Sequence, residues 1–403
     1  MVCMKQRWQF WVDRGGTFTD IVAKRPDGCL VFRKLLSEHP ECYADATLQG
    51  IRDFLDLAPD APLPTERIEA IKMGTTVGTN ALLERKGEPT ALFITRGFGD
   101  ALRIGYQNRP ELFALHIVLN ESLHKIAIEV SERMSARGEE LEPVDVGATR
   151  EALEKAFDAG IRAVAIVFLH GYRYPEHERQ VAQLARQVGF PQISVSHEVS
   201  SLIRLVSRGD TTVVDAYLSP LLRRHIEHML TSLDRRHGGT RLMYMQSHGG
   251  LIDAHLFQGK DSILSGPAGG IVGGAMTAAR AGFDKVITFD MGGTSTDVAH
   301  YAGDFERRFE SEIGGIRLRS PMLYIHTVAA GGGSVLHFES GRFLVGPDSA
   351  GADPGPVCYR RGGPLTVTDG NLLLNRICPD FFPRVFGPRG DQPLDADAVQ
   401  RKF

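Results

Sequence analysis

The sequence predicts an α/β fold built as two lobes. Apolar runs of strand length alternate with segments whose apolar residues recur at helical spacing, which is typical of mixed sheets flanked by helices. One eight-residue pattern also occurs twice, far apart in the chain, each time between two strand-like runs. With 403 residues, 42% of them hydrophobic, the chain is long enough for two or three domains and a sizeable core.

The N-terminal region begins with three predicted strands and continues with helices and strands in alternation. The strands are expected at Gln9–Val12, Phe18–Lys24, Cys29–Leu35, Ile68–Gly74, Thr90–Ile94 and Ala163–Leu169. The helices are expected at Tyr43–Leu57, Val77–Lys86, Arg150–Ala159 and His177–Val188. Residues 101–144 show less regular periodicity, so we expect an insertion that covers the site.

The second region opens with a long predicted helix. The later elements are expected as a helix at Thr211–Leu233, a strand at Arg241–Met245, a small-residue helix at Ser265–Ala281, a strand at Val286–Phe289 and a loop at Gly346–Pro356. We place the domain boundary so that residues 1–195 form one domain and residues 196–403 the other. A last helix begins near Asp395 shortly before the chain stops, so we expect the second domain to be truncated at its C-terminus.

The composition argues against several classes of protein. The net charge of −3 gives no electrostatic reason to expect binding to nucleic acid or to an anionic membrane. The five cysteines are scattered and never spaced C-x-x-C, which predicts neither a disulfide framework nor a zinc site. No signal-peptide pattern and no membrane-length apolar run is visible, so we expect a cytoplasmic protein.

The repeated pattern predicts two phosphate-binding hairpins. It reads D-R-G-G-T-F-T-D at Asp13–Asp20 and D-M-G-G-T-S-T-D at Asp290–Asp297. Paired glycines let backbone N–H groups approach an anion closely, and Thr17 and Thr294 add hydroxyl donors. A carboxylate at the head of each copy would repel phosphate unless a cation lies between them, and Mg²⁺ is the expected ion. The alternative for a single copy is an ordinary tight turn.

The pattern assigns roles to residues of both copies. Asp13 and Asp290 are expected to hold Mg²⁺, largely through water. The residues expected to bind the nucleotide are Gly15, Gly16, Thr17, Thr19, Gly292, Gly293, Thr294, Thr296, Gly331, Gly332 and Gly333. The last three glycines either pass beneath the nucleotide or only form a tight crossover.

Further polar residues are candidates for catalysis. Arg14 puts a cation where the second copy has Met291, and it either meets the phosphates or substrate or forms a surface ion pair. Asp20 and Asp297 either orient a nucleophile or stabilise the turns by hydrogen bonds.

Two groups of residues are candidates for substrate binding. Thr75, Thr76 and Asn80 lie at a strand-to-helix junction, where they bind an anion or cap the helix. Arg103, Arg109 and Arg208 match carboxylates in geometry, although pairing with a nearby Asp or Glu is the commoner fate of an arginine.

A series of motifs in one order resembles the hydantoinase A and ATP-dependent 5-oxoprolinase family, within the actin-like and sugar-kinase-like ATPases. Besides the two hairpin motifs, the matching segments are M-G-T-T-V-G-T-N-A-L-L-E-R-K-G at Met73–Gly87, I-G-Y-Q-N-R-P at Ile104–Pro110, S-R-G-D at Ser207–Asp210, Q-S-H-G-G at Gln246–Gly250, S-G-P-A-G-G at Ser265–Gly270, A-G-G-G-S at Ala330–Ser334, S-A-G-A-D-P-G-P at Ser349–Pro356 and T-V-T-D at Thr366–Asp369. The resemblance covers nearly the whole chain and is closer to the 5-oxoprolinase branch.

The resemblance implies an actin-like, ribonuclease H-like ATPase fold and an enzyme that opens a five-membered cyclic amide at the expense of ATP. For 5-oxoproline the product is glutamate. It implies ATP and Mg²⁺ as cofactors and a hydantoinase B-like hydrolase component, either a separate subunit or a missing downstream segment. We also expect a homo-oligomer that binds neither nucleic acid nor membrane.

Other functions stay open at this point. An N-methylhydantoinase or the ATP-binding subunit of a ketone carboxylase would have nearly the same sequence. An inactive nucleotide-binding fragment or scaffold is the alternative from another class. The chain also departs from the family pattern at three glycines, Gly78, Gly99 and Gly370, where the family usually has alanine, arginine and a non-glycine residue.

Overall fold

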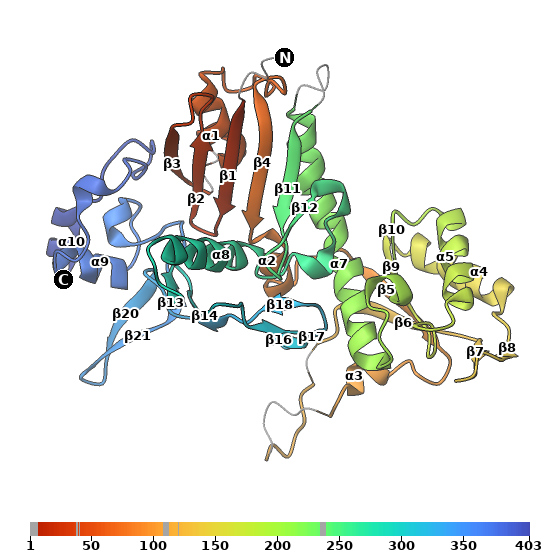
Figure 1. Ribbon diagram of the computed structural model, residues 1–403. Helices are drawn as coiled ribbons and strands as arrows, with labels where there is room; N and C mark the ends of the chain where they lie inside the picture. Colours follow the sequence, from red (N-terminus) through yellow and green to blue (C-terminus); the bar gives the residue numbers. More distant parts are fainter. Residues whose placement is uncertain (1–6, 38, 40, 108–112, 120, 234–238) are drawn as a thin grey trace.

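The computed structural model describes residues 7–37, 39, 41–107, 113–119, 121–233 and 239–403. It is a mixed α/β structure in which several sheets are flanked by helices, as Figure 1 shows, so the predicted fold class is confirmed. None of the helices in the described ranges is both long and apolar enough to cross a membrane.

The largest sheet has six strands and carries the first copy of the repeated pattern. In spatial order its strands are β12 (Leu251–Asp253), β11 (Arg241–Met245), β4 (Ile68–Thr75), β1 (Trp8–Arg14), β2 (Phe18–Lys24) and β3 (Leu30–Leu36). β1 pairs antiparallel with β2 and parallel with β4. The sheet therefore takes strands from both sides of the proposed boundary at residues 195 and 196, which stays a prediction.

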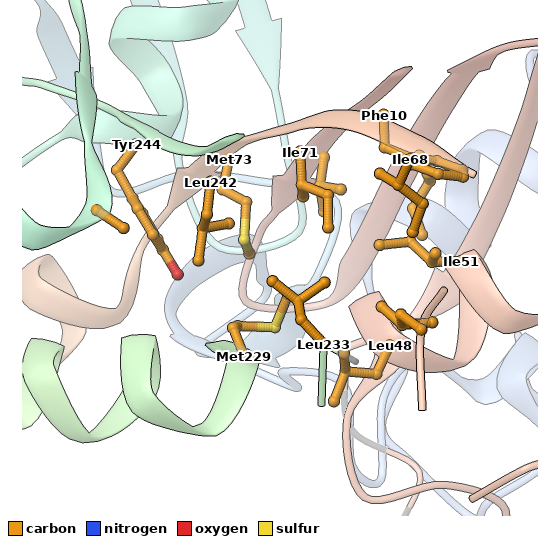
Figure 2. Packing of buried hydrophobic residues seen from close by; sticks show 14 of the residues in the cluster. Phe10, Leu48, Ile51, Ile68, Ile71, Met73, Met229, Leu233, Leu242 and Tyr244 are labelled. Atoms are coloured by element: carbon orange, nitrogen blue, oxygen red, sulfur yellow. The ribbon is translucent and has the colours of Figure 1, made fainter. Parts of the chain in front are cut away.

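One face of the six-stranded sheet is covered by helices, and the alternation of side chains along β1 shows which one. Side chains on a strand point to opposite faces in turn, so Phe10 and Val12 share one face and Asp13 points to the other. The Phe10 side is buried against α1 (Ala46–Leu55) and the C-terminal half of α7 (Leu205–Thr231), as Figure 2 shows. Burial of this face fixes the register, because a shift of one residue would expose the core.

A four-stranded sheet forms a second body beside α7 (Figure 1). Its strands in spatial order are β10 (Gln192–Val195), β9 (Ala163–Val167), β5 (Thr90–Thr95) and β6 (His124–Val130). Its helices are α3 (Ala101–Ile104), α4 (Val146–Asp158), α5 (Glu176–Val188) and α6 (Ser196–Val199), and β7 (Arg133–Met134) pairs with β8 (Glu140–Glu142). The prediction of an irregular 101–144 is wrong for β6, which pairs parallel with β5 at the sheet edge.

The second copy of the pattern lies in a smaller, three-stranded sheet. This sheet consists of β13 (Lys285–Met291), β14 (Thr296–Ala302) and β19 (His326–Val328). The adjoining short pairs are β15 (Arg307–Arg308) with β18 (Met322–Leu323), and β16 (Ser311–Ile313) with β17 (Ile316–Leu318). The helix α8 (Ser265–Arg280) packs against β1 and β4 of the large sheet and against β13 and β14, so it joins the two sheets.

The last part of the chain contains a hairpin and two short helices. They are β20 (Ser334–Glu339) with β21 (Arg342–Ser349), α9 (Val367–Leu373) and α10 (Ala396–Lys402). The predicted loop Gly346–Pro356 is wrong in its first part, because β21 extends to Ser349. Asp369 organises the segment before α9: its buried carboxylate accepts hydrogen bonds from the backbone N–H groups of Val357, Cys358 and Thr366 at 3.1, 2.9 and 2.9 Å.

Replacing Asp369 with Ala is expected to lower the free energy of unfolding by about 3 kcal/mol. The substitution leaves three buried N–H groups without an acceptor, and each such loss costs about 1–3 kcal/mol before relaxation. Urea denaturation of the whole chain measures the change. Asp380→Ala, at an exposed carboxylate, is the control, and an equal effect of both substitutions would contradict this role.

Candidate functional site

Both copies of the repeated pattern form the same hairpin turn. In the first, the Gly15 N–H donates to the Phe18 carbonyl at 3.0 Å, and in the second the Gly292 N–H donates to the Ser295 carbonyl at 2.9 Å. Asp13 pairs with Asp20 across β1 and β2, and Asp290 pairs with Asp297 across β13 and β14. The prediction of two hairpins with a carboxylate at the end of each first strand is confirmed.

The two hairpin tips touch. A Cβ atom at Gly293 would lie 2.8 Å from the Thr17 Oγ1, so only a residue without a side chain fits between the tips without displacement. Two turns that are separated by more than two hundred residues thus form the two sides of one site.

A glycine segment holds the second tip from behind. The N–H groups of Gly332 and Gly333 donate to the carbonyls of Gly292 and Gly293 at 2.9 and 2.7 Å. A Cβ atom at Gly331 would lie 2.6 Å from the Gly293 carbonyl carbon and oxygen. The segment Gly331–Gly333 therefore supports the backbone of the tip directly, through contacts that only glycine allows.

Asp13 lies between the end of β4 and the beginning of α8. Cβ atoms added at Gly74 and Gly266 would lie 3.3 and 3.2 Å from its Oδ1, so both glycines leave room for the carboxylate. Ser265 anchors this corner, since its hydroxyl donates to the Met245 carbonyl at 2.7 Å. The positive end of the α8 dipole is directed at the same region, which favours negative charge there.

The carboxylates of the two lobes act on one another. The pKa of Asp13 is raised to about 6, first because neighbouring atoms displace water and then because Asp20 and Asp290 repel its charge. Asp297 also has a raised pKa, caused first by burial, while a hydrogen bond from Thr327 opposes the shift and Asp290 adds to it. Asp13 keeps contact with solvent, so screening makes its effect on stability small. The site thus concentrates negative charge.

One amine opposes this charge, and it makes the two lobes unequal. Across β1, β2 and β3 the facing residues are Asp13, Asp20 and Lys34; the Lys34 Nζ lies 2.6 Å from the Asp20 Oδ2. At the matching place in the second lobe, Asp297 faces Thr327, whose hydroxyl donates at 2.6 Å. Lys34 was not among the predicted site residues; the register of β2 with β3 places it opposite Asp20.

Three predicted site residues use their side chains within the protein. Arg14 points away from Asp13 and pairs with Asp45 at 3.0 Å. The Thr19 hydroxyl lies 3.0 Å from the Ser37 hydroxyl, and the Thr296 hydroxyl donates to the Ala330 carbonyl at 2.6 Å. These side chains lie on the faces opposite the carboxylates, because they occupy alternate strand positions. Their proposed nucleotide and catalytic roles stay predictions.

The first group of substrate candidates lies next to the first hairpin. Thr76 donates through its hydroxyl to the Arg14 carbonyl at 3.3 Å and precedes α2 (Val77–Leu83). Thr75 is buried, and its hydroxyl accepts from the Val77 N–H at 3.2 Å, while Asn80 is exposed one turn into the helix.

The arginine candidates are dispersed. Arg208 is fully buried, donates to the Phe168 and Leu169 carbonyls at 2.9 and 3.0 Å, and lies 3.6 Å from Glu178. Arg103 lines a separate cavity of about 70 Å³. Arg109 lies outside the described residues. The structure therefore brings none of the described arginine candidates to the hairpin tips.

Comparison with known proteins places the chain in a family. The hydantoinase/oxoprolinase N-terminal region model matches residues 9–189, and the hydantoinase/oxoprolinase model matches residues 208–403. The chain is 45% identical to 5-oxoprolinase 1 of Arabidopsis thaliana over 98% of its own length and 33% of the plant chain. It is 41% identical to 5-oxoprolinase of Saccharomyces cerevisiae, over 97% of this chain and 33% of the yeast chain. The chain thus spans about a third of the length of these two 5-oxoprolinases.

Two solved structures have a similar fold. One is the ATP-dependent caprolactamase of Pseudomonas jessenii, with a TM-score of 0.75 and 32% identity over 97% of this chain and 57% of that chain. The other is nucleotide-free acetone carboxylase, with a TM-score of 0.77 at 23% identity over 97% of this chain and 57% of that chain, which supports the fold alone. The two family models, which match residues 9–189 and 208–403, and the 5-oxoprolinase relatives at 41–45% identity establish that the chain belongs to the hydantoinase/oxoprolinase family.

Proposed function

We propose that the two hairpin tips bind the phosphates of ATP from opposite sides. The contact between Gly293 and Thr17 supports this proposal most directly, because it brings two glycine-rich turns to a single site. Backbone N–H groups of Gly16 and Gly293 are suited to phosphate oxygens, and the hydroxyls of Thr17 and Thr294 add further donors. The similar caprolactamase of Pseudomonas jessenii is ATP-dependent, which supports the choice of ATP as the ligand.

The residues at the tips fit a Mg²⁺ ion that travels with the phosphates. The negative charges of Asp13 and Asp290 repel one another, and a divalent cation between them would remove that repulsion. Within the described part of the chain, no group of three or more His, Cys, Asp or Glu side chains is arranged to hold a metal. The two carboxylates would therefore hold the ion together with water and phosphate oxygens, which is the usual arrangement for magnesium.

The reaction we propose is the ATP-dependent opening of a cyclic amide, with 5-oxoproline giving glutamate. Relatives named 5-oxoprolinase and caprolactamase subunit alpha support this substrate class. An amide carbonyl is a poor electrophile, and transfer of the γ-phosphoryl group to its oxygen would make the carbon open to attack by water. Such a transfer depends on positioning and charge neutralisation, which are what these hairpins offer.

The ring-opening step requires a hydrolase component, which we place in another subunit or in a further segment. The name caprolactamase subunit alpha supports a division of labour between subunits in that relative. The share of 33% that this chain covers in the 5-oxoprolinases supports the alternative arrangement, in which one long chain carries both components.

Measurement of ADP release tests the proposed function. The chain, alone and with a hydrolase component from a relative, is incubated with Mg-ATP and with 5-oxoproline, caprolactam or hydantoin in turn. We expect ADP release to be stimulated by 5-oxoproline more than by the other two. Stimulation by hydantoin alone would overturn the substrate assignment, and the absence of any Mg-ATP binding would overturn the nucleotide site.

Replacing Lys34 with Met is expected to weaken Mg-ATP binding roughly 10-fold to 100-fold, because the only amine of the Asp13–Asp20–Lys34 row is lost. Titration calorimetry measures the change, and Lys34→Arg should restore part of the affinity. Lys24→Met, on an exposed lysine of the same β2–β3 pair, is the control. Equal affinities of all variants for Mg-ATP would show that Lys34 does not contribute to nucleotide binding.

A further inference from the structure

Ser37, the residue that follows β3, holds the first hairpin tip through three contacts. Its hydroxyl donates to the Gly15 carbonyl at 2.7 Å, and its N–H donates to the Thr17 carbonyl at 2.9 Å. The Thr19 hydroxyl lies 3.0 Å from the Ser37 hydroxyl. Ser37 is 6% exposed and Thr19 is 0% exposed, so these hydrogen bonds are largely shielded from competition by water.

The direction of the hydrogen bonds between these hydroxyls follows from their chemistry. Each hydroxyl carries a single hydrogen, and Ser37 directs its own at the Gly15 carbonyl. The Thr19 hydroxyl is therefore the donor to the Ser37 oxygen. Hydrogen bonds in such a chain polarise and strengthen one another. Thr19 and Ser37 thus form a directed chain that ends on the backbone of the first tip.

The second lobe holds its tip at the equivalent atom by other means. In the repeated pattern Gly292 matches Gly15. The Gly292 carbonyl accepts a hydrogen bond from the Gly332 N–H at 2.9 Å. A backbone amide in one lobe and the side chain of Ser37 in the other therefore fix the same carbonyl of the two hairpins.

A fixed carbonyl also fixes the amide that follows it. The peptide group is planar and trans, so the C=O of one residue and the N–H of the next point in opposite directions. Ser37, which holds the carbonyl before Gly16, therefore directs the Gly16 N–H away from itself. Gly332 does the same for the Gly293 N–H. Gly16 and Gly293 supply the backbone donors of the proposed phosphate site.

We propose that Ser37 is a positioning residue of the nucleotide site, whose hydroxyl aims the Gly16 N–H at the phosphates of ATP. This inference rests on the proposed function, in which both tips bind one nucleotide. Without the hydroxyl, the peptide between Gly15 and Gly16 loses the bond that fixes its plane, so the donor has to be oriented when the nucleotide binds. A donor is most effective toward a charged ligand when it is oriented beforehand.

Three substitutions test the role of this hydroxyl. Ser37→Ala removes it without a change of charge, and Ser37→Thr keeps it. Thr240→Ala is the control, because the Thr240 hydroxyl donates to the carbonyl of Ile68 at 2.9 Å, at the opposite end of β4 from the hairpin tips. Titration calorimetry measures Mg-ATP affinity, and hydrogen exchange detected by NMR follows the Gly16 and Gly293 amides with and without saturating Mg-ATP.

We expect Ser37→Ala to bind Mg-ATP at least about tenfold more weakly than the wild type, and Ser37→Thr to stay within about threefold of it. Ser37→Ala and Thr240→Ala each lose one hydrogen bond from a side chain to the backbone, so both should lower the melting temperature slightly. Only Ser37→Ala should lose affinity. At saturation its Gly293 amide should be protected as in the wild type and its Gly16 amide less so, a difference that a general loss of stability would not produce.

The outcomes separate this inference from the proposed function. Wild-type affinity in Ser37→Ala, an equal loss of affinity in Thr240→Ala, or full protection of Gly16 in Ser37→Ala would overturn the role of Ser37 and leave the nucleotide site in place. Absence of Mg-ATP binding by the wild type would overturn the proposed function, and the inference with it.

Discussion

Replacing Asp290 with Asn is expected to weaken Mg-ATP binding by at least about 100-fold and to abolish ATP turnover. Asp290 is the residue of the second lobe whose charge reaches Asp13, so it is needed if one cation is held from both sides. The side chain is exposed at the end of β13 and is matched in size by Asn, so the melting temperature should stay within about 1 °C of the wild type.

The matched control is Asp284→Asn, at an exposed aspartate immediately before the same strand. It removes the same charge from the chain without touching the hairpin tip, so Mg-ATP affinity should be unchanged. Titration calorimetry and ADP release measure both variants. Normal turnover by the Asp290→Asn variant would contradict its assignment, and a similar loss in the control would show that net charge, not position, determines binding.

Replacing Gly331 with Ala tests whether the glycine segment Gly331–Gly333 holds the second hairpin tip in place. The new Cβ would lie 2.6 Å from the Gly293 carbonyl and 2.8 Å from the Gly292 oxygen, and backbone atoms cannot rotate away as a side chain can. We expect the tip to be displaced, with a loss of about 2–4 kcal/mol in the free energy of unfolding and at least tenfold weaker Mg-ATP binding.

Gly370→Ala serves as the control for this substitution. No atom lies within 4 Å of a Cβ at Gly370, which is inside α9, so alanine should be neutral or stabilise the protein by up to about 1 kcal/mol. Denaturation and hydrogen exchange of Gly292–Thr294 measure the outcome. Unchanged exchange at this tip in the Gly331→Ala variant would contradict the supporting role of the glycine segment.

The hairpins could be predicted from the sequence because their signals are local. A carboxylate, two glycines and two threonines between apolar runs determine a tight turn without distant contacts, and the same signal occurs twice in the chain. Strands β1, β2 and β4 were predicted within about two residues for the same reason. The edge strand β6 was missed inside a long region of weak periodicity.

The arrangement around the hairpins depends on long-range contacts that no local pattern contains. Arg14 pairs with Asp45 at the beginning of α1, and Gly331 lies against the backbone of Gly293 in the second hairpin tip. The importance of Lys34 follows from the register of β2 with β3, which places it opposite Asp20. Gly78 shows the same limit: a Cβ there would lie 2.1 Å from the Ser262 hydroxyl, a contact that explains glycine only once the fold is known.

Hydrogen exchange of both tips during titration with Mg-ATP tests the central claim most directly. The amides of Gly15–Thr17 and of Gly292–Thr294 are followed in one sample while calorimetry gives the stoichiometry. We predict that both sets slow together, with one nucleotide bound per chain. Protection of one tip alone, or two nucleotides bound independently, would contradict a single site closed by both hairpins.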